Sequence, residues 1–301
     1  MAKLEPFRGE YYLWKYLPSA AAAAVFLVLF LIATLAISWR IWRTRTWFCS
    51  AFAVGGLFQV IGYAARIVSR NNTAKLMPYA IQNAFILLSP VLFAASVYMT
   101  LSRVIRAVGG ERHALFRPAR LTRVFVAGDV IAMSVQSGAA GLMVVSSLAS
   151  VGQGIVVAGL AFHVVVFGVF FVAAALFHVR MRRDPAARHI PSRIQWEQLL
   201  RALYVSSGLI MGRSIFRMIE FIMGHDGYLL STEWPLYVFD AVPMLAVMVV
   251  FWWRFPSGVQ HPSYNRGLGE AASGDSMMSM AGVSADAPRK GEHGAGSGAT
   301  A

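Results

Sequence analysis

This sequence of 301 residues has little of what soluble proteins and most enzymes are built from. Only 14% of the residues are charged, and a single cysteine, Cys49, excludes both a disulfide framework and a site made of several thiolates. The lysines are all outside the long apolar runs, which excludes a retinal Schiff base; they are Lys3, Lys15, Lys75 and Lys290. The sequence also has no G-x-x-x-x-G-K-[ST] phosphate loop and no G-x-S-x-G turn for a serine nucleophile.

The histidines do not predict a catalytic metal centre. Of the seven histidines, only His163 lies deep within an apolar run, and His178 lies at the end of one. An intramembrane zinc hydrolase needs about three converging protein ligands. We therefore expect no metal ion or other cofactor, and the sequence does not predict an enzyme.

Long apolar runs dominate the chain. Hydrophobic residues make up 57% of it and its mean hydropathy is +0.57, more apolar surface than a soluble domain can bury. A helix crosses a bilayer with about 20 apolar residues. Such runs occur at residues 17–38, 47–68, 77–101, 122–145, 154–177, 202–223 and 234–254. The first is too long for a signal peptide, so the sequence predicts an all-α membrane protein, a bundle of seven transmembrane helices.

The arginines predict the orientation of this bundle. The formal net charge of +13 gathers in the first, third and fifth loops, and the third loop carries Arg103, Arg106, Arg112, Arg117, Arg120 and Arg123. The sixth loop has Asp226 and Glu233 and no Lys or Arg. Because short cytoplasmic loops are rich in basic residues, we expect the N-terminus outside and the C-terminus in the cytoplasm. Such clusters suit anionic lipid headgroups rather than nucleic acid, and the third loop offers a surface to a cytoplasmic partner.

One folded domain is expected, the seven helices of residues 17–256, after an extracellular segment of residues 1–16. Residues 257–301 are rich in Gly, Ser, Ala and Met, which predicts a disordered cytoplasmic tail. The sequence leaves two modifications open. The sequon at Asn71 falls on the outer side, and Cys49, at the inner edge of the second run, is either S-acylated or an inert buried thiol.

Charged residues inside an apolar run predict the functional site. Arg213, Arg217 and Glu220 lie on one face of the helix expected at 202–223. Each charge near the centre of a spanning helix costs roughly 2.5–3.5 kcal/mol on insertion scales. This face must therefore point into protein or water rather than lipid.

Polar residues of other runs fall at mid-depth or in the outer half, and we expect them to form a polar vestibule with this face. They are Gln59, Tyr63, Arg66, Gln82, His163 and Asp240. The vestibule would hold one positive charge in excess, since it has three arginines, Arg66, Arg213 and Arg217, and two acids, Glu220 and Asp240. The alternative is that these side chains are internal ties between helices that contact no ligand.

Asp129 and Gln136 share a face of the fourth run, apart from the vestibule. Asp129 is expected to pair with Arg123 or Arg201, and its role is either structural or part of a transport pathway. His163 is more simply interpreted as a core histidine. Pro90 and Pro243 lie inside runs and predict kinks.

Several motifs in order along residues 16–256 resemble the fungal lipid-translocating exporter family, the RTA-like proteins associated with aminocholesterol resistance and sphingoid long-chain base release. The matching pieces are Tyr16-Leu-Pro18-Ser19, Ile61-Gly62-Tyr63 with Arg66, Gln82 with Leu88-Ser-Pro90 and Ala94-Ala95-Ser96-Val97-Tyr98, Asp129-Val130 with Gln136 and Gly138, Gly154-Ile-Val-Val-Ala-Gly159-Leu160, Arg213-Ser214-Ile215-Phe216-Arg217 with Glu220, and Tyr237-Val-Phe239-Asp240. The family usually has Glu in place of Gln59 and Gln in place of His163.

The resemblance implies seven helices, a plasma-membrane or vacuolar-membrane location, and export or flipping of amphiphiles such as sphingoid bases or sterol-like compounds, with a role in stress or drug resistance. Its partners would be membrane lipids and lipophilic small molecules. Gln59 removes a carboxylate that could accept a proton or an amine, which leaves the cargo and any proton coupling open. The alternative function is a seven-helix receptor or sensor of lipids without net transport.

Overall fold

The structure is a computed structural model that describes residues 18–70, 73, 75–142, 148–185, 195–223 and 232–257. The expected extracellular segment, the sequon at Asn71 and the expected disordered tail, apart from residue 257, lie outside these residues. All described residues belong to one compact unit, which spans residues 1–260.

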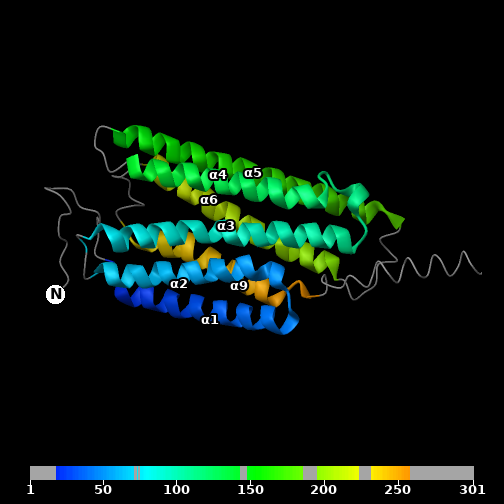
Figure 1. The fold of residues 1–301 in the computed structure, drawn as a ribbon, viewed down its shortest axis with the longest axis horizontal. Helices are drawn as coiled ribbons and strands as arrows, with labels where there is room; N and C mark the ends of the chain where they lie inside the picture. The colour runs from blue at the N-terminus through cyan, green and yellow to red at the C-terminus, as the bar shows by residue number, and fades with distance from the viewer. Residues whose placement is uncertain are drawn as a thin grey trace, which may run out of the picture. The chain divides into compact units, whose positions relative to one another are not determined.

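The described part of this unit consists of helices and connecting turns, without strands (Figure 1). Six long helices are α1 (Ala20–Thr44), α2 (Ser50–Arg70), α3 (Leu76–Ala107), α4 (Pro118–Leu142), α5 (Ala149–Arg183) and α6 (Trp196–Ile222). A seventh is continuous through α8 (Trp234–Leu236), η5 (Tyr237–Ala241) and α9 (Val242–Trp253). Short 3₁₀ turns, η1 (Trp47–Cys49) and η2 (Glu111–His113), precede α2 and α4. The all-helical prediction is confirmed.

Within the described residues, five helical segments are long and apolar enough to cross a membrane: Ala20–Thr44, Trp47–Arg70, Met77–Ala107, Ser150–Arg183 and Trp234–Trp253. The chain is therefore a multi-pass membrane protein. The remaining long helices, α4 and α6, have 25 and 27 residues, enough to cross as well. Both carry charged residues in their middle, Asp129 in α4 and the Arg213–Arg217 pair in α6.

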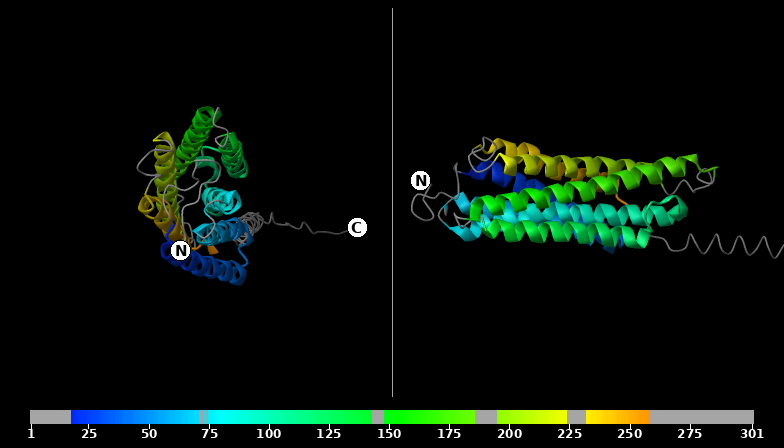
Figure 2. Two further views of the ribbon diagram at one scale, coloured as in Figure 1. Left: turned by 90° about the vertical axis from the view of Figure 1, so that its left-hand side faces the viewer. Right: turned by 90° about the horizontal axis from the view of Figure 1, so that it is seen from above.

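The helices form a closed ring in chain order, with each helix against the next and α9 against α1. Figure 2 shows this ring in its left-hand view, along the helices. In addition, α3 contacts α6 across the ring, and it lies between α2 and α4 (Figure 1). α3 is therefore the helix that links the two sides of the bundle.

Close packing of α2 against α3 depends on glycine. A Cβ atom at Gly62 would lie 2.6 Å from Cγ1 of Ile86, and one at Gly55 would lie 2.8 Å from Cε1 of Phe93. Small residues at such interfaces let helix backbones approach closely in a membrane, where dispersion contacts replace the hydrophobic effect. A larger side chain at Gly62 would push the two helices apart.

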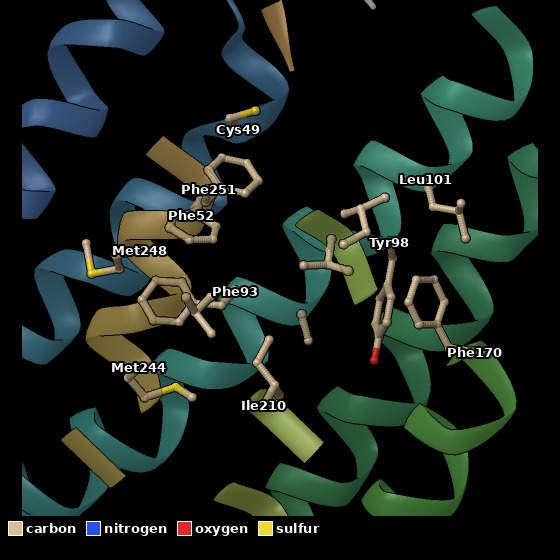
Figure 3. Close-up of a cluster of buried hydrophobic side chains, with 14 of the residues drawn as sticks. Cys49, Phe52, Phe93, Tyr98, Leu101, Phe170, Ile210, Met244, Met248 and Phe251 are labelled. Atoms are coloured by element: carbon tan, nitrogen blue, oxygen red, sulfur yellow. The ribbon is translucent and has the colours of Figure 1, made fainter. Parts of the chain in front are cut away.

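Aromatic and sulfur-containing side chains fill the core on this side of the ring. Figure 3 shows Phe52, Phe93 and Phe251 together with Met244 and Met248. The rings of Phe52 and Phe251 stack with their centroids 4.0 Å apart. Cys49 lies in the same core, fully buried and without a disulfide, which agrees with the inert thiol and not with an acylated one.

Both prolines inside helices leave main-chain carbonyls without their usual partner. Pro90 lies within α3, and its missing N–H cannot bond the carbonyl of Ile86 four residues earlier. Pro243 follows the π-helical turn η5, in which the N–H of Val242 donates to the carbonyl of Tyr237, five residues back. Such π turns occur frequently at functional sites, and this one carries Asp240.

Candidate functional site

Arg213 of α6 and Asp240 of η5 form a buried ion pair, in which Nε of the arginine donates to Oδ1 of the carboxylate. The two side chains come from separate helices and are 4% and 1% exposed. Nη2 of Arg213 donates a further hydrogen bond, 3.2 Å long, to the main-chain oxygen of Ile86 in α3. The expected meeting of charges from different helices away from lipid is therefore present.

Arg217 extends this pair into a network of four charges. Its Nη2 donates to Oδ2 of Asp240, and its Nη1 donates to Oε2 of Glu220 over 2.8 Å. Arg217 and Glu220 are 8% and 4% exposed. We call Arg213, Arg217, Glu220 and Asp240 the ion cluster. Two positive and two negative charges make it neutral, which is what burial in a low dielectric requires.

The π turn explains how one carboxylate serves both arginines. Arg213 and Arg217 lie one turn apart on α6, so their guanidinium groups reach Asp240 from different heights. Each oxygen of Asp240 accepts from one of them. Asp240 lies within η5, and Pro243 follows the π turn in the first turn of α9.

Arg66 lies in a second cluster, with a partner that the sequence analysis did not assign to it. Its Nη2 is 2.7 Å from Oε1 of Glu233, and its Nε donates to Oη of Tyr237 over 3.2 Å. Tyr237 in turn donates to the same carboxylate. The main-chain N–H of Ser19 also donates to Glu233, 3.0 Å from each oxygen. We call these four residues the Arg66 cluster.

Glu233 corrects the expected charge balance. Counting Arg66 with Arg213 and Arg217 against two acids left one positive charge in excess, which was wrong because Glu233 was assigned to the sixth loop. It lies at the first turn of α8, where its side chain reaches back to α2. Together the two clusters hold three arginines and three acids. The single sequence signal was that Glu233 directly precedes the apolar run at 234–254.

Three uncharged polar side chains that the sequence assigned to the vestibule are also buried. Gln59, Tyr63 and Gln82 are buried, and within the described part of the chain Oη of Tyr63, Oε1 of Gln82 and both amide atoms of Gln59 have no hydrogen-bond partner. The ring of Tyr63 stacks on Phe26 and Phe30 of α1, with centroids 5.9 and 5.4 Å away. Buried polar atoms without partners are uncommon in folded proteins.

Asp129 lies in a third, separate site on the other side of α3. Tyr98 donates to its Oδ2 over 2.8 Å, and Nδ1 of His163 lies 3.0 Å from its Oδ1, within ion-pair distance although not aligned as a hydrogen bond. We call these three residues the Asp129 site. The prediction that Asp129 pairs with Arg123 or Arg201 was wrong. Arg123 is exposed, and Arg201 pairs with Glu197.

His163 is buried, as expected of a core histidine, and it also contacts an acid from α4. Gln136, two turns along α4 from Asp129, is buried against Gly159 of α5, where a Cβ atom would lie 2.8 Å from its Cγ. Tyr98 was not assigned to the site from the sequence, although it closes one of the quoted motifs.

Among the described residues, no group of three or more His, Cys, Asp or Glu side chains is placed to hold a metal ion.

Comparison with known proteins relates the chain to a family of fungal membrane proteins. The family described as RTA1 like protein matches residues 52–262. Protein RTM1 of Saccharomyces cerevisiae is 34% identical over 81% of this chain and 91% of its own length. Protoporphyrin uptake protein 1 of the same yeast is 33% identical over 79% of this chain and 90% of its own length.

A more distant relative is named as a transporter of a lipid. The sphingoid long-chain base transporter RSB1 of Saccharomyces cerevisiae is 25% identical over 68% of this chain and 62% of its own length. No solved structure matches the chain.

Proposed function

The chain belongs to the RTA1-like protein family, and we propose from that membership that it translocates amphiphiles across a membrane, by export or by flipping between leaflets. Relatives named for sphingoid-base transport and protoporphyrin uptake support transport of lipophilic compounds. Sphingoid bases and protoporphyrin are different compounds, but both combine an apolar body with polar or charged groups. We propose sphingoid bases and sterol-like compounds as the cargo class, with resistance to toxic amphiphiles as the consequence.

The observation that carries this proposal is the buried ion cluster between α6 and η5. A charge network inside a membrane marks a pathway or binding site more often than a simple support. Asp240 or Glu220 would receive a cargo amine, and Arg213 or Arg66 would hold a phosphate or carboxylate. A charged cargo head would replace one partner of an existing pair, and the displaced side chain would then need water or a cargo group of opposite charge as its new partner.

In this conformation the ion cluster is buried, so a cargo enters only after helices separate. We propose seven crossings, with the N-terminus outside and the C-terminus in the cytoplasm of a plasma-membrane protein. The Arg66 cluster, at the ends of α1, α2 and α8 that this orientation places outside, then lies between the ion cluster and the outer surface. Opening of the Arg66–Glu233 pair would form the vestibule.

The test is transport by variants that neutralise the ion cluster. Purified protein in liposomes should move a fluorescent sphingoid base between leaflets, and Arg213→Gln or Asp240→Asn should each lower the rate at least tenfold. The exposed pair of Arg182 and Glu197, with side chains 65% and 36% exposed, supplies matched controls. Arg182→Gln and Glu197→Gln should keep the wild-type rate. Wild-type rates in both Arg213→Gln and Asp240→Asn, at equal amounts of folded protein, would refute the role of the cluster.

A receptor without transport is the second candidate. The loop between α3 and α4, together with the adjoining helix ends, exposes Arg106, Arg112, Arg117 and Arg120, which would suit an acidic cytoplasmic partner. Binding of the labelled lipid without movement between leaflets would favour this reading over translocation.

A further inference from the structure

The Asp129 site joins three helices through titratable side chains that the proposed cargo site does not use. Asp129 of α4 is fully buried, Tyr98 of α3 is fully buried, and His163 of α5 is 6% exposed. Both carboxylate oxygens have a close neighbour, the phenol at 2.8 Å and the imidazole at 3.0 Å. A carboxyl, an imidazole and a phenol in contact are the usual components of proton pathways in membrane proteins.

Aromatic rings enclose this site. Tyr98 packs on Phe125, Phe167 and Phe170 with centroids 5.6, 5.7 and 4.5 Å away, and Figure 3 shows Tyr98 beside Phe170. The His163 ring stacks on Phe167 at 6.1 Å. A negative charge in such apolar surroundings is unfavourable unless a positive charge accompanies it.

The arginines of the surrounding helices do not supply this positive charge. In α6, Arg213 and Arg217 pair with Asp240 and Glu220. In α3, Arg103 lies over the ring of Phe48 and Arg106 donates to Ser102, both near its inner end.

The remaining arginines of these helices lie near the inner ends of α4, α5 and α6, and in α6 Arg201 pairs with Glu197. In α4 they are Arg120 and Arg123, both exposed, and in α5 they are Arg180, Arg182 and Arg183. Within the described residues, His163 is therefore the side chain that would carry a positive charge beside Asp129 when it is protonated.

We propose that Asp129 and His163 together bind one proton, and that its uptake from one side of the membrane and release to the other drives translocation. This inference rests on the proposed function. With neutral His163 the pair carries one negative charge, and one added proton makes the pair neutral, whether the imidazole or the carboxyl holds it. No covalent bond changes, so the cycle needs only water as the proton source and sink.

α3 provides the connection from this site to the ion cluster. Tyr98 contacts Asp129, and the carbonyl of Ile86 accepts from Arg213, so one helix contacts both sites. The two positions are 12 residues apart in the chain, about 18 Å along a helix. Pro90 lies between them and removes one intrahelical hydrogen bond. A shift of Tyr98 when the proton binds can thus be transmitted as a bend of α3 at Pro90.

Two measurements on the purified full-length protein test the proposal. Infrared difference spectra between acidic and alkaline pH report proton binding directly. The wild type should show carboxyl or imidazole bands that are lost in both Asp129→Asn and His163→Gln. His178→Gln is the matched control, since His178 lies on the same helix but stacks on Tyr204 instead. Bands that persist in both site variants would overturn the proton site.

The second measurement uses liposomes with a pH difference across the membrane and a fluorescent sphingoid base. With one proton per cargo molecule, a difference of one pH unit should produce a ratio of up to about tenfold between leaflets. In His163→Gln the ratio should fall to one, while His178→Gln should keep it. If the wild type moves the lipid but the ratio between leaflets does not depend on the pH difference, the proton coupling is refuted and the proposed translocation is not. If the wild type moves no lipid under any condition, translocation itself fails, and the infrared bands alone still decide the proton site.

Discussion

Arg213 donates a hydrogen bond to the main-chain oxygen of Ile86, with Nη2 3.2 Å from the acceptor. In a regular helix that oxygen would accept from residue 90, which here is a proline without an N–H. The arginine of α6 therefore satisfies a carbonyl that α3 itself cannot. Pro90 of α3 and Arg213 of α6 are therefore linked through this carbonyl. A change of either residue should alter the hydrogen bonding of the other helix.

Replacing Pro90 by alanine should separate stability from transport. Alanine restores the N–H that bonds the carbonyl of Ile86, so Arg213 must share this acceptor with the main chain of α3. We expect the variant to be at least as stable as the wild type in thermal denaturation, but to move lipid several-fold more slowly. Pro118→Ala is the control, because Pro118 is the first residue of α4, where a missing N–H costs nothing. If Pro90→Ala moves lipid at the wild-type rate, Pro90 is not needed for transport.

A double-mutant cycle should show that Arg213 and Asp240 act as a unit. Arg213→Gln leaves the ion cluster with one negative charge in excess, and Asp240→Asn leaves one positive charge in excess. Breaking a buried pair in this way typically costs about 3–5 kcal/mol. The double variant is neutral again, so its loss should be smaller than the sum of the two, with a coupling of about 0.5–3 kcal/mol. Unfolding titrations in mixed micelles measure all four proteins. Additive losses would contradict the pairing.

Gly62 should not tolerate even one additional methyl group. The new Cβ would meet Cγ1 of Ile86 at 2.6 Å, and overpacking of this kind costs about 1–3 kcal/mol. Gly62→Ala should therefore lower the unfolding temperature, and adding Ile86→Ala should recover part of the loss by removing the obstacle. A Cβ atom at Gly168 of α5 would meet no atom within 4 Å, so Gly168→Ala is the neutral control.

The predicted orientation can be tested by cysteine labelling, because the single native cysteine should not react. Cys49 is fully buried and should not react with a maleimide in the folded protein. New cysteines at two exposed positions, Ser150→Cys and Glu111→Cys, lie near opposite ends of the helices. An impermeant maleimide added to intact cells should label the first and not the second. The reverse pattern would invert the orientation.

The sequence predicted the helices well because their signal is local. Each apolar run is continuous and sufficient by itself, so the seven predicted ranges all overlap the observed helices. The charges of α6 were placed correctly for a similar reason, since the spacing of Arg213 and Arg217 sets their face. Partner choice was not predictable in this way. Glu233 meets Arg66, and Tyr98 meets Asp129, only because the fold brings separate helices close in space. Such proximity leaves no mark in the spacing of residues along one helix.

The contact between Glu233 and the main chain of Ser19 spans 214 positions of the sequence. During synthesis α1 leaves the ribosome long before α8 exists, so this bond forms only when the last helix has been inserted. Until then the start of α1 has an unsatisfied N–H, and Arg66 has no acid beside it. Assembly should accordingly finish at this corner, and a chain truncated before Glu233 should be recognised by quality control even though its first six helices are complete.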